Sequence, residues 1–554
     1  MSEIASVALL LRNDGILKFL EAKETKKHKK RKKVKKMIND AIAKSYEAAN
    51  YASHAYEQSF IANLHARARL RGLNPKAPNS AKVLEIGCAS GGNLIAQALV
   101  FKDAQFTGID LSKAQIKNGK TALKKIGIKN IDLLCLDICD AVAHFGSQKF
   151  DYIIAHGVYS WVPPFVQKAI LQLCGKLLSK DGVAMISYNV YPGWKFKEIT
   201  RDFMRFASSD VSVEDEPERK LDVALGALAF EQAFYRTDLA NDSYQLVTRQ
   251  AKAALGMISH LPRHYLIHDY LELCNYPAYF CDFVADGEDA GLAYVDDMQL
   301  CFDTKVLGHE ALRQYEKASF ASRVQKEQMH DFLNATAFRH SLLTLKENES
   351  ALKLEYKDLE FSGLFIGIKA KSQSLKERSK NSASHALICA LLDAYPGTIS
   401  CDEASRIAGD RLAECVFELI SKFDVAIYFS SVPFNAIKYE AGKSRIRADY
   451  LGFLRFLASP ENKNFVLCTP KNSVYALHKN DCEAVFMMDG RHSKADIVAH
   501  FVELCQKNNA APSRIIDGKK VLIESKKEQE VYFDEAISTL ISDLEAQCMF
   551  ESIS

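Results

Sequence analysis

A glycine-rich turn follows an apolar run near residue 83, and its residue types suit nucleotide binding. The stretch Val83–Leu99 reads VLEIGCASGGNLIAQAL, so an apolar strand leads into a small-residue loop and then into an apolar-periodic helix. The spacing differs from the G-x-G-x-x-G of dinucleotide sites, and an acid stands two residues before the first glycine. Small residues let the backbone approach a methionine and a ribose. The loop lacks the additional residues that a pyrophosphate site would need. The loop therefore predicts an S-adenosylmethionine site, with candidate residues Glu85, Gly87, Ala89, Gly91, Gly92 and Asn93.

Two carboxylates follow at the ends of the next two strand-like runs. QFTGID ends in Asp110, which we expect to accept hydrogen bonds from both ribose hydroxyls, and NIDLLCLDI contains Asp137, which we place at the adenine amino group. Leu111 and Ile138, which come directly after these acids, belong to the same predicted site. An aspartate at a strand end can instead cap the following helix. The order and spacing of the loop, the two acids and the fourth strand, FDYIIAHG, favour a class I methyltransferase.

Aromatic side chains follow the fourth and fifth predicted strands, in HGVYSWVPP and SYNVYPGW. The carboxyl ends of parallel strands share one edge of a sheet, so both loops are expected to face the transferred methyl group. Aromatic rings attract a cationic acceptor by about 0.5 to 2 kcal/mol. The alternative is that these rings pack between domains. The candidate acceptor-site residues are His156, Tyr159, Trp161, Tyr188, Asn189, Tyr191 and Trp194.

The loop after the fourth strand also bears on the acceptor. It reads His-Gly-Val-Tyr and not Asn-Pro-Pro-Tyr, which disfavours amide or exocyclic-amine acceptors such as DNA adenine. A lysine acceptor must lose a proton before it can react. Tyr188, Tyr191 or His156 could orient the amine or relay that proton, and His156 could instead simply pack within the loop.

Several motifs together resemble the bacterial protein lysine methyltransferases of rickettsial type, which are class I enzymes with a methyltransferase regulatory domain. The catalytic part matches in SYEAANYASHAYEQSFIANLHARARLRGL, VLEIGCASGGNLI, HGVYSWVP and SYNVYPGW, and the regulatory part in LPRHYLIHDYLE, PAYFCDFV and EQMHDFLNATAFRHSLL. The sequence departs from the group at Ala89, where many members have glycine, and in YASHAYEQSF, which has less proline than usual. The resemblance implies S-adenosylmethionine as cofactor and protein lysines as acceptors, including those of a surface or outer-membrane protein. A small-molecule O- or C-methyltransferase and a regulatory protein that only binds the cofactor remain as alternatives.

The chain divides by composition and periodicity into an α/β methyltransferase domain and three further parts. LDVALGALAFEQAF and the segment from Met329 to Leu343 have helical spacing, EFSGLFIGIKAK is typical of a strand, and three short helices before VAIYFSS have the order of a winged helix. We predict a basic extension (1–40), a Rossmann-like methyltransferase domain with an N-terminal lid (41–210), a mostly helical regulatory domain (211–368), a linker (369–383), a winged-helix-like domain (384–440) and a small α/β C-terminal domain (441–554).

Charge and composition exclude several classes of function. The 554 residues carry a net charge of +3, yet Lys26–Lys36 alone holds nine Lys or Arg in eleven residues, so the remainder is acidic. This run could anchor RNA or acidic lipid, or be an extension without a role. The winged-helix-like segment has seven Asp or Glu against four Lys or Arg, which disfavours nucleic acid. We expect no membrane span, no secretory signal and a cytoplasmic location.

Cysteine and histidine spacing raises one metal hypothesis. His260, His264 and His268 are spaced by four, and Cys274 and Cys281 follow. Pro262 disturbs a helix that would align the histidines, and no C-x-x-C accompanies them. We therefore predict no metal, and we interpret the fourteen scattered cysteines as reduced thiols in apolar surroundings.

Overall fold

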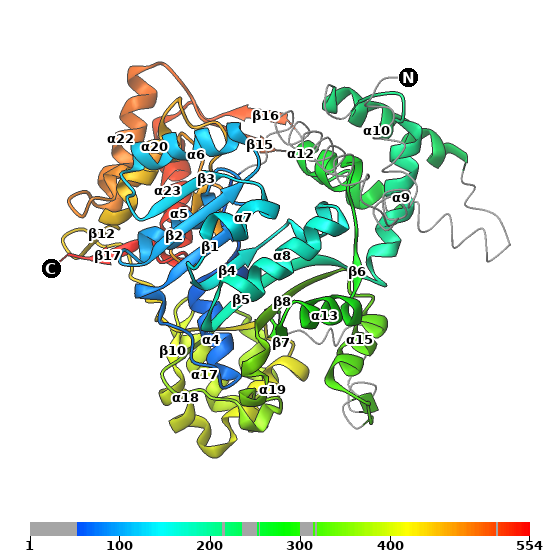
Figure 1. Ribbon diagram of the computed structural model, residues 1–554. Coiled ribbons are helices and arrows are strands. Elements are labelled where there is room, and N and C mark those ends of the chain that lie inside the picture. The colour runs from blue at the N-terminus through cyan, green and yellow to red at the C-terminus, as the bar shows by residue number, and fades with distance from the viewer. Residues whose placement is uncertain are drawn as a thin grey trace.

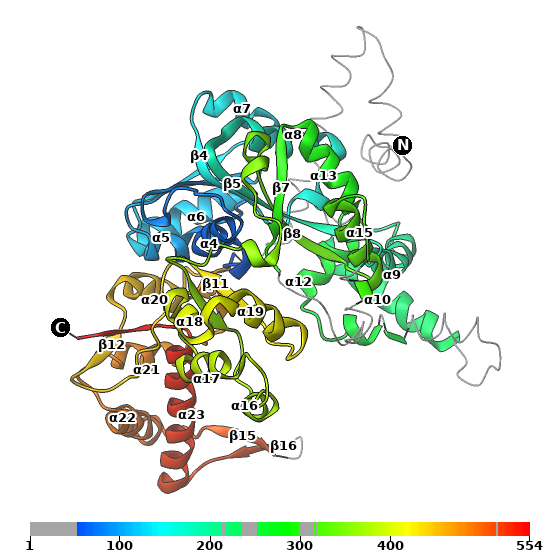
Figure 2. The same ribbon diagram turned by 90° about the horizontal axis from the view of Figure 1, so that it is seen from below.

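The computed structural model describes residues 53–212, 216–234, 252–253, 255–299, 314–315, 318–516 and 519–553. Figures 1 and 2 show these parts in two perpendicular views. The predicted basic extension, 1–40, and its Lys26–Lys36 run lie outside the described residues.

A mixed eight-stranded sheet forms the centre of the molecule (Figure 1). Its order is β3-β2-β1-β4-β5-β8-β7, and β6 pairs with the end of β5. The strands from β3 to β5 pair in parallel, whereas β8 runs antiparallel to β5 and β7 antiparallel to β8. The strands are β1 (Lys82–Ile86), β2 (Gln105–Asp110), β3 (Ile131–Cys135), β4 (Phe150–Ala155), β5 (Leu178–Tyr191), β6 (Ala278–Tyr279), β7 (Leu292–Asp297) and β8 (Phe338–Leu345).

Helices bury both faces of this sheet, which explains why its central strands are apolar runs without alternation. Successive side chains of β1 point to opposite faces, so Val83 packs with one core and Leu84 with the other. The first face is covered by α4 (Ile61–Leu70), α5 (Gly92–Val100) and α6 (Lys113–Ile126). The second face is covered by α7 (Ile138–Phe145), α8 (Pro164–Leu177) and α13 (Phe280–Asp289).

The segment predicted as a mostly helical regulatory domain completes the catalytic sheet. Its strands β7 and β8 extend the sheet beyond β5, with Tyr188 of β5 opposite Arg339 of β8. The helix predicted from Met329 to Leu343 is wrong in its second half, because α15 (Arg323–Asn334) ends there and β8 follows. Ala335 has φ of 48°, so it adopts the left-handed conformation that ends the helix. The apolar residues beyond it are buried as a strand between two neighbours, where periodicity alone does not distinguish strand from helix.

Four helical elements lie together at the carboxyl edge of the parallel strands, and we call them the covering helices. They are α9 (Trp194–Ala207), α10 (Pro217–Phe234), α12 (Arg263–Leu266) and the π-helical turn Ile267–Leu271. Met204, Leu221 and Ile267 belong to a separate small apolar core that holds them together. The helix predicted from LDVALGALAFEQAF is confirmed as α10. Figure 1 shows α9, α10 and α12 grouped on one side of the sheet.

Three helices and a three-stranded sheet form the unit predicted to resemble a winged helix. The helices are α17 (His385–Ala394), α18 (Cys401–Ala408) and α19 (Leu412–Ser421), and the sheet has the order β10 (Ile399–Ser400), β9 (Phe365–Ile368) and β11 (Ile427–Ser430). Strand β9 was assigned by sequence to the preceding segment, but Ile366 and Ile368 are buried in the core of this unit. Helix α16 (Gln373–Arg378) lies in the stretch that was expected to be a linker.

The C-terminal part packs against the first face of the catalytic sheet and shares its core. Phe453 and Leu454 lie in the same apolar cluster as Leu123 of α6. A Cβ on Gly452 would lie 2.4 Å from the carbonyl oxygen of Ile126, so this close approach requires glycine. Its helices are α20 (Leu451–Ala458), α21 (Asp481–Met487), α22 (Lys494–Lys507) and α23 (Lys526–Ala546).

Three strand pairs complete the C-terminal part. They are β12 (Ser444–Ile446) with β17 (Phe550–Ser552), β13 (Leu467–Cys468) with β14 (Val474–Tyr475), and β15 (Ser513–Ile516) with β16 (Lys519–Leu522). Figure 2 shows α21, α22 and α23 beside β12 and at a distance from α9 and α10. None of the described helices combines the length and apolarity that a bilayer crossing requires.

Candidate functional site

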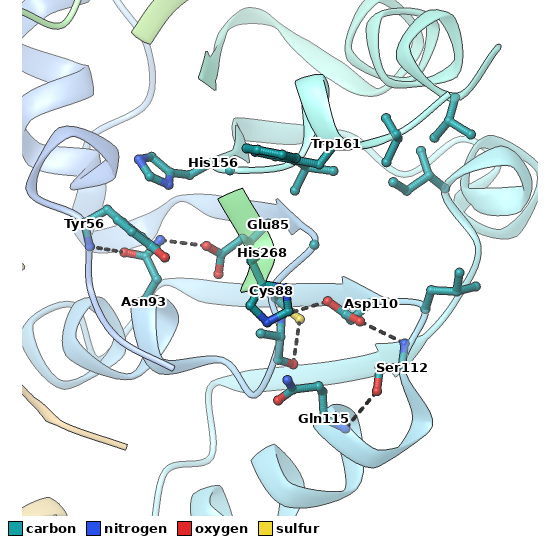
Figure 3. A pocket seen from close by; sticks show the side chains of 18 of the residues that line it. Tyr56, Glu85, Cys88, Asn93, Asp110, Ser112, Gln115, His156, Trp161 and His268 are labelled. Atoms are coloured by element: carbon teal, nitrogen blue, oxygen red, sulfur yellow. Dashed lines mark hydrogen bonds between the residues drawn. The ribbon is translucent and has the colours of Figure 1, made fainter. Parts of the chain in front are cut away.

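A cavity of about 580 Å³ opens at the carboxyl ends of β1, β2, β4 and β5. This is the edge where an open α/β sheet binds its ligands. Figure 3 shows Glu85 and Asp110 at the strand ends and Asn93 of α5 beside Glu85, with His156 and Trp161 across the cavity from them. The predicted residues that line the cavity are Glu85, Gly87, Ala89, Asn93, Asp110, Leu111, Asp137, Ile138, His156, Trp161, Asn189 and Trp194.

The loop after β1 passes close to other backbone and side-chain atoms, which explains its small residues. A Cβ on Gly87 would lie 2.3 Å from Cγ2 of Val158, and Gly87 has φ of 70°. Ala89 has φ of 48°, a conformation that glycine adopts without a steric penalty. Alanine at this position therefore keeps the left-handed backbone conformation, with some local steric strain. In this conformation the Ala89 N–H donates to Oδ2 of Asp110 at 2.9 Å.

The carboxylate of Asp110 is fixed by backbone donors on both sides. Oδ2 accepts from Ala89, and Oδ1 accepts from the N–H of Ser112 at 2.8 Å. Burial raises the pKa of Asp110, and the bonds from Ser112 and Ala89 oppose that rise. Each oxygen retains a lone pair, so the group can accept from a diol such as the ribose of the cofactor.

Asp137 combines the two roles that the sequence left open. Its Oδ1 accepts from the N–H of Cys139 at 2.9 Å and so caps helix α7. The same residue and Ile138 line the cavity. Asp137 therefore caps the helix and lines the cavity at the same time.

Glu85 and Asn93 form a buried pair at the floor of the cavity. Nδ2 of Asn93 donates to Oε1 of Glu85 at 2.7 Å, while Oε2 of Glu85 is buried without a hydrogen-bond partner in the described part of the chain. The pKa of Glu85 is raised to about 8, mainly by burial; the hydrogen bond from Asn93 opposes this rise and the nearby Asp110 adds to it. An orphaned carboxylate oxygen in a cavity fits a cationic ligand group. The methionine ammonium of S-adenosylmethionine supplies that group, so these residues fit the predicted cofactor.

Asn93 is held in its orientation by donors from two distant parts of the chain. Its Oδ1 accepts from the N–H of Tyr56 at 3.0 Å, from Oγ of Ser59 at 2.9 Å and from Nδ2 of Asn472 at 3.1 Å. Because three donors face this oxygen, the amide nitrogen must point to Glu85. Asn472 belongs to the C-terminal part and is fully buried, and no sequence motif identified it.

Gly91 and Gly92, which were predicted to bind the cofactor, do not line the cavity. Gly91 has φ of 82° and precedes the first residue of α5. The N–H of Gly92 donates to Oγ of Ser53 at 2.8 Å, and a Cβ there would lie 2.4 Å from the Ser53 carbonyl carbon. These glycines thus allow the helix to start and the segment before α4 to pack against it. Ser53 itself lines the cavity.

Trp161 and Trp194 form an aromatic wall of the cavity. Their rings meet edge to face with centroids 6.0 Å apart, and Nε1 of Trp194 donates to Oδ1 of Asn275 at 2.8 Å. Asn189 also faces the cavity, and its Nδ2 is buried without a partner among the described residues. This contact explains why both tryptophans follow strand ends, since each ring covers part of the other at the cavity edge.

His156 stacks between two other rings. Its centroid lies 3.8 Å from that of Tyr56 and 5.5 Å from that of His340. Burial holds the pKa of His156 well below its usual value, and His340 and His54 lower it further. The imidazole is therefore neutral at pH 7, and its Nδ1 has no partner in the described structure.

Three predicted tyrosines do not line the cavity, contrary to the sequence prediction. Tyr188 is buried, its ring stacks on Phe283 at 4.0 Å, and its hydroxyl contacts Oγ of Ser341 at 3.0 Å. Tyr159 is also buried and packs edge to face against Tyr188. Tyr191 donates to Oε1 of Glu198 at 2.7 Å on the outer side of α9. Tyr159 and Tyr188 therefore pack against the regulatory segment, which is the alternative that the sequence left open.

The covering helices supply cavity residues that the sequence did not identify. These are Lys197 from α9, Tyr265 from α12, and His268 and Asp269 from the π-helical turn. His54 and Tyr56 add to the wall from the segment before α4. The sequence carried two signals here: the histidine spacing around His268, which was tested for metal binding alone, and the motif LPRHYLIHDYLE, which was assigned only to the regulatory part. Among the described residues, no group of three or more His, Cys, Asp or Glu could hold a metal ion.

Comparisons with known proteins agree with this architecture. A family model described as "Methyltransferase domain" matches residues 78–227, and one described as "Predicted methyltransferase regulatory domain" matches residues 262–344. An uncharacterized protein of Rickettsia prowazekii is 33% identical over 62% of this chain, and the match spans 60% of that relative's length. A second uncharacterized protein of the same organism is 35% identical, with 95% of its length and 45% of this chain covered.

A solved structure shares the fold over most of the chain. PKMT2 from Rickettsia typhi superposes with a TM-score of 0.71 at 23% identity, covering 90% of this chain and all of that one, and it has also been solved in complex with AdoHcy. AdoHcy is the product left when S-adenosylmethionine has given up its methyl group. The two family matches and the well-covered rickettsial relative show that this chain belongs to the S-adenosylmethionine-dependent class I methyltransferases that carry a methyltransferase regulatory domain.

Proposed function

We propose that this protein transfers methyl groups from S-adenosylmethionine to lysine amines of a protein substrate. The observation that carries the proposal is the acceptor end of the cavity, whose lining includes Trp161, Trp194 and Tyr265 together with the carboxylate of Asp269. Rings and a carboxylate attract an ammonium group, whereas a neutral phenol or enol gains little from them. The likeness to PKMT2 supports the fold of such an enzyme.

Each end of the cavity has a separate task. Asp110 and Glu85 hold the polar groups of the cofactor and fix its position against the strand ends. The bound cofactor supplies an electrophilic methyl group on a sulfonium sulfur. Trp161 and Trp194 exclude water from the acceptor side and orient the amine, and the neutral His156 and the carboxylate of Asp269 are positioned to accept a proton from it. We place the acceptor among surface or outer-membrane proteins and the reaction in the cytoplasm.

A labelling experiment tests this proposal against its alternatives. The purified protein is incubated with methyl-labelled S-adenosylmethionine and a cell lysate, and the protein and small-molecule fractions are analysed separately by mass spectrometry. We expect label in methyllysine of the protein fraction, absent when Asp110→Ala replaces the wild type. Label in small molecules alone would favour O- or C-methylation, to which a 32% identity over 106 residues with a ubiquinone biosynthesis O-methyltransferase of Idiomarina loihiensis also points. Binding of the cofactor without any transfer would favour a regulatory binding protein.

A further inference from the structure

Lys197 is the one lysine among the described residues that line the cavity. It lies in the first turn of α9, three residues after Trp194, and its side chain is 26% exposed. The cofactor residues contribute acidic and amide groups to the same cavity. A primary amine is therefore present inside the site where a methyl group is to be transferred.

The ammonium of Lys197 lies in a box of aromatic rings closed by a carboxylate. Nζ is 4.6 Å from the centroid of Trp194 and 5.5 Å from those of Tyr265 and Tyr270. It donates to Oδ2 of Asp269 at 2.7 Å and to the hydroxyl of Tyr265 at 3.3 Å. We call these four residues the ammonium box. Rings on several sides and one acceptor suit an amine in any methylation state, because cation-π attraction does not depend on N–H donors.

The ammonium box belongs to the acceptor side of the cavity. Trp194 packs edge to face on Trp161, which follows β4, whereas Glu85 and Asp110 hold the other side at β1 and β2. The box therefore has the composition and the place that an acceptor lysine of another protein would need. Lys197 occupies it from within the same chain.

We propose that Lys197 is a self-methylation site, whose amine enters the reaction from the ammonium box in place of an acceptor lysine. This inference rests on the proposed function, since it requires an enzyme that methylates amines. The Nζ proton passes to the carboxylate of Asp269, which it already contacts, and from there to solvent. The Nζ lone pair forms the new N–C bond, and the S–C bond of the cofactor breaks with its electron pair remaining on sulfur. The products are methylated Lys197, S-adenosylhomocysteine and a proton.

Lys195 provides a matched control two residues away. Its Nζ also lies over aromatic rings, 5.1 Å from Tyr191 and 5.7 Å from Tyr279, but its side chain is exposed and does not line the cavity. Chemical methylation without catalysis would modify the exposed Lys195 at least as fast as Lys197. Methylation of Lys197 with Lys195 unmodified would thus show that the reaction takes place in the cavity.

Peptide mass spectrometry of the full chain tests the proposal. After incubation with methyl-labelled S-adenosylmethionine we expect label on Lys197, none on Lys195 and none at either in Asp110→Ala. The labelled fraction at a given time should not change with protein concentration, because donor and acceptor belong to one chain. Unlabelled Lys197 in a preparation that methylates other proteins would overturn this inference and leave the proposed function intact. Absence of methyllysine from every protein would overturn the proposed function.

A second test needs no cofactor. Lys197→Ala removes the resident amine and leaves the ammonium box vacant, so n-butylammonium, which resembles a lysine side chain, should bind this variant and not the wild type. Calorimetry with n-butanol, which lacks the charge, should show at least tenfold weaker binding to the variant. Lys195→Ala is the control and should bind neither probe. Equal binding of n-butylammonium to wild type and Lys197→Ala would show that the box does not accept an amine, which would overturn the inference.

Discussion

Binding of the cofactor is expected to depend on pH through Glu85. Its orphaned Oε2 can pair with the methionine ammonium only when the carboxyl group is ionised, and burial raises the pKa of Glu85 to about 8 in the free protein. At about pH 6 roughly one molecule in a hundred carries the charge, and at about pH 8 roughly half do. If the ammonium lowers that pKa well below 6 in the complex, affinity should rise about 50-fold over this range, or about 2.3 kcal/mol.

Calorimetry with S-adenosylhomocysteine measures this change directly. Titrations at about pH 6 in two buffers of different ionisation enthalpy should show close to one proton released per ligand bound. Glu85→Gln keeps the size of the side chain and its bond to Asn93 but cannot ionise, so its affinity should be weaker near pH 8 and should vary less with pH. Any dependence of affinity on pH that remains in Glu85→Gln is attributed to Asp110, whose pKa is also raised by burial. Wild-type affinity that changes less than about threefold between these pH values would refute the role of Glu85.

The same shift predicts the sign of a stability change in the free protein. The folded state keeps a proton on Glu85 up to about pH 8, whereas the unfolded chain loses it near the ordinary glutamate pKa of 4.5. The folded state therefore binds more protons between these values, and the free energy of unfolding contributed by Glu85 falls as pH rises through this range. Denaturant unfolding of the wild type should show this fall, and Glu85→Gln should lack that part of it.

Substitutions at three positions separate cofactor residues from packing residues. Asp110→Ala removes the acceptor that Ala89 and Ser112 hold in place, so cofactor affinity should drop by about 2 to 3 kcal/mol in calorimetry with the fold retained; unchanged affinity would reject the ribose assignment. Asn472→Asp replaces a donor to Asn93 by a buried acceptor, so it should weaken cofactor binding about tenfold or more. Asn472→Gly loses the same bond but adds no charge, so its affinity should fall less. Equal cofactor affinities of both variants and the wild type would contradict this. Tyr188→Phe removes only a hydroxyl that contacts Ser341 in the core, so it should cost about 1 kcal/mol of stability and leave kcat unchanged; a lower kcat would return Tyr188 to the acceptor site.

The cofactor half of the site could be predicted from sequence because its signals are local. The stretch from Glu85 to Asn93 needs small residues where the backbone turns, and Asp110 ends β2 while Asp137 closely follows the adjacent strand β3. In a parallel α/β unit, each strand end follows its own apolar run at a nearly fixed distance, so short motifs place their side chains without knowledge of distant contacts. Gly91 and Gly92 do not line the cavity, and a glycine required for a helix start has the same sequence signal as one required for ligand approach.

The acceptor half could not be predicted residue by residue, because its side chains are selected by contacts between distant segments. The aromatic motif SYNVYPGW begins in strand β5 and ends at the start of helix α9, and the partner strand β8 and helix α13 decided which of the strand's rings are buried. Trp194 faces the cavity while Tyr188, six residues earlier, lies in the core against Phe283. The period of the strand predicted two faces, but not which face would be covered by the regulatory segment.

The sequence by itself determined the class of fold, the cofactor and the strand ends that hold it, since each depends on a continuous stretch of chain with its own periodicity. Tertiary structure alone decided that the regulatory segment completes the catalytic sheet, that Asn472 of the C-terminal part orients Asn93, and that Lys197 lies in the ammonium box. These contacts join residues that are tens to hundreds of positions apart, and many alternative pairings satisfy the same local pattern. Only the simultaneous burial of all apolar faces selects one of them.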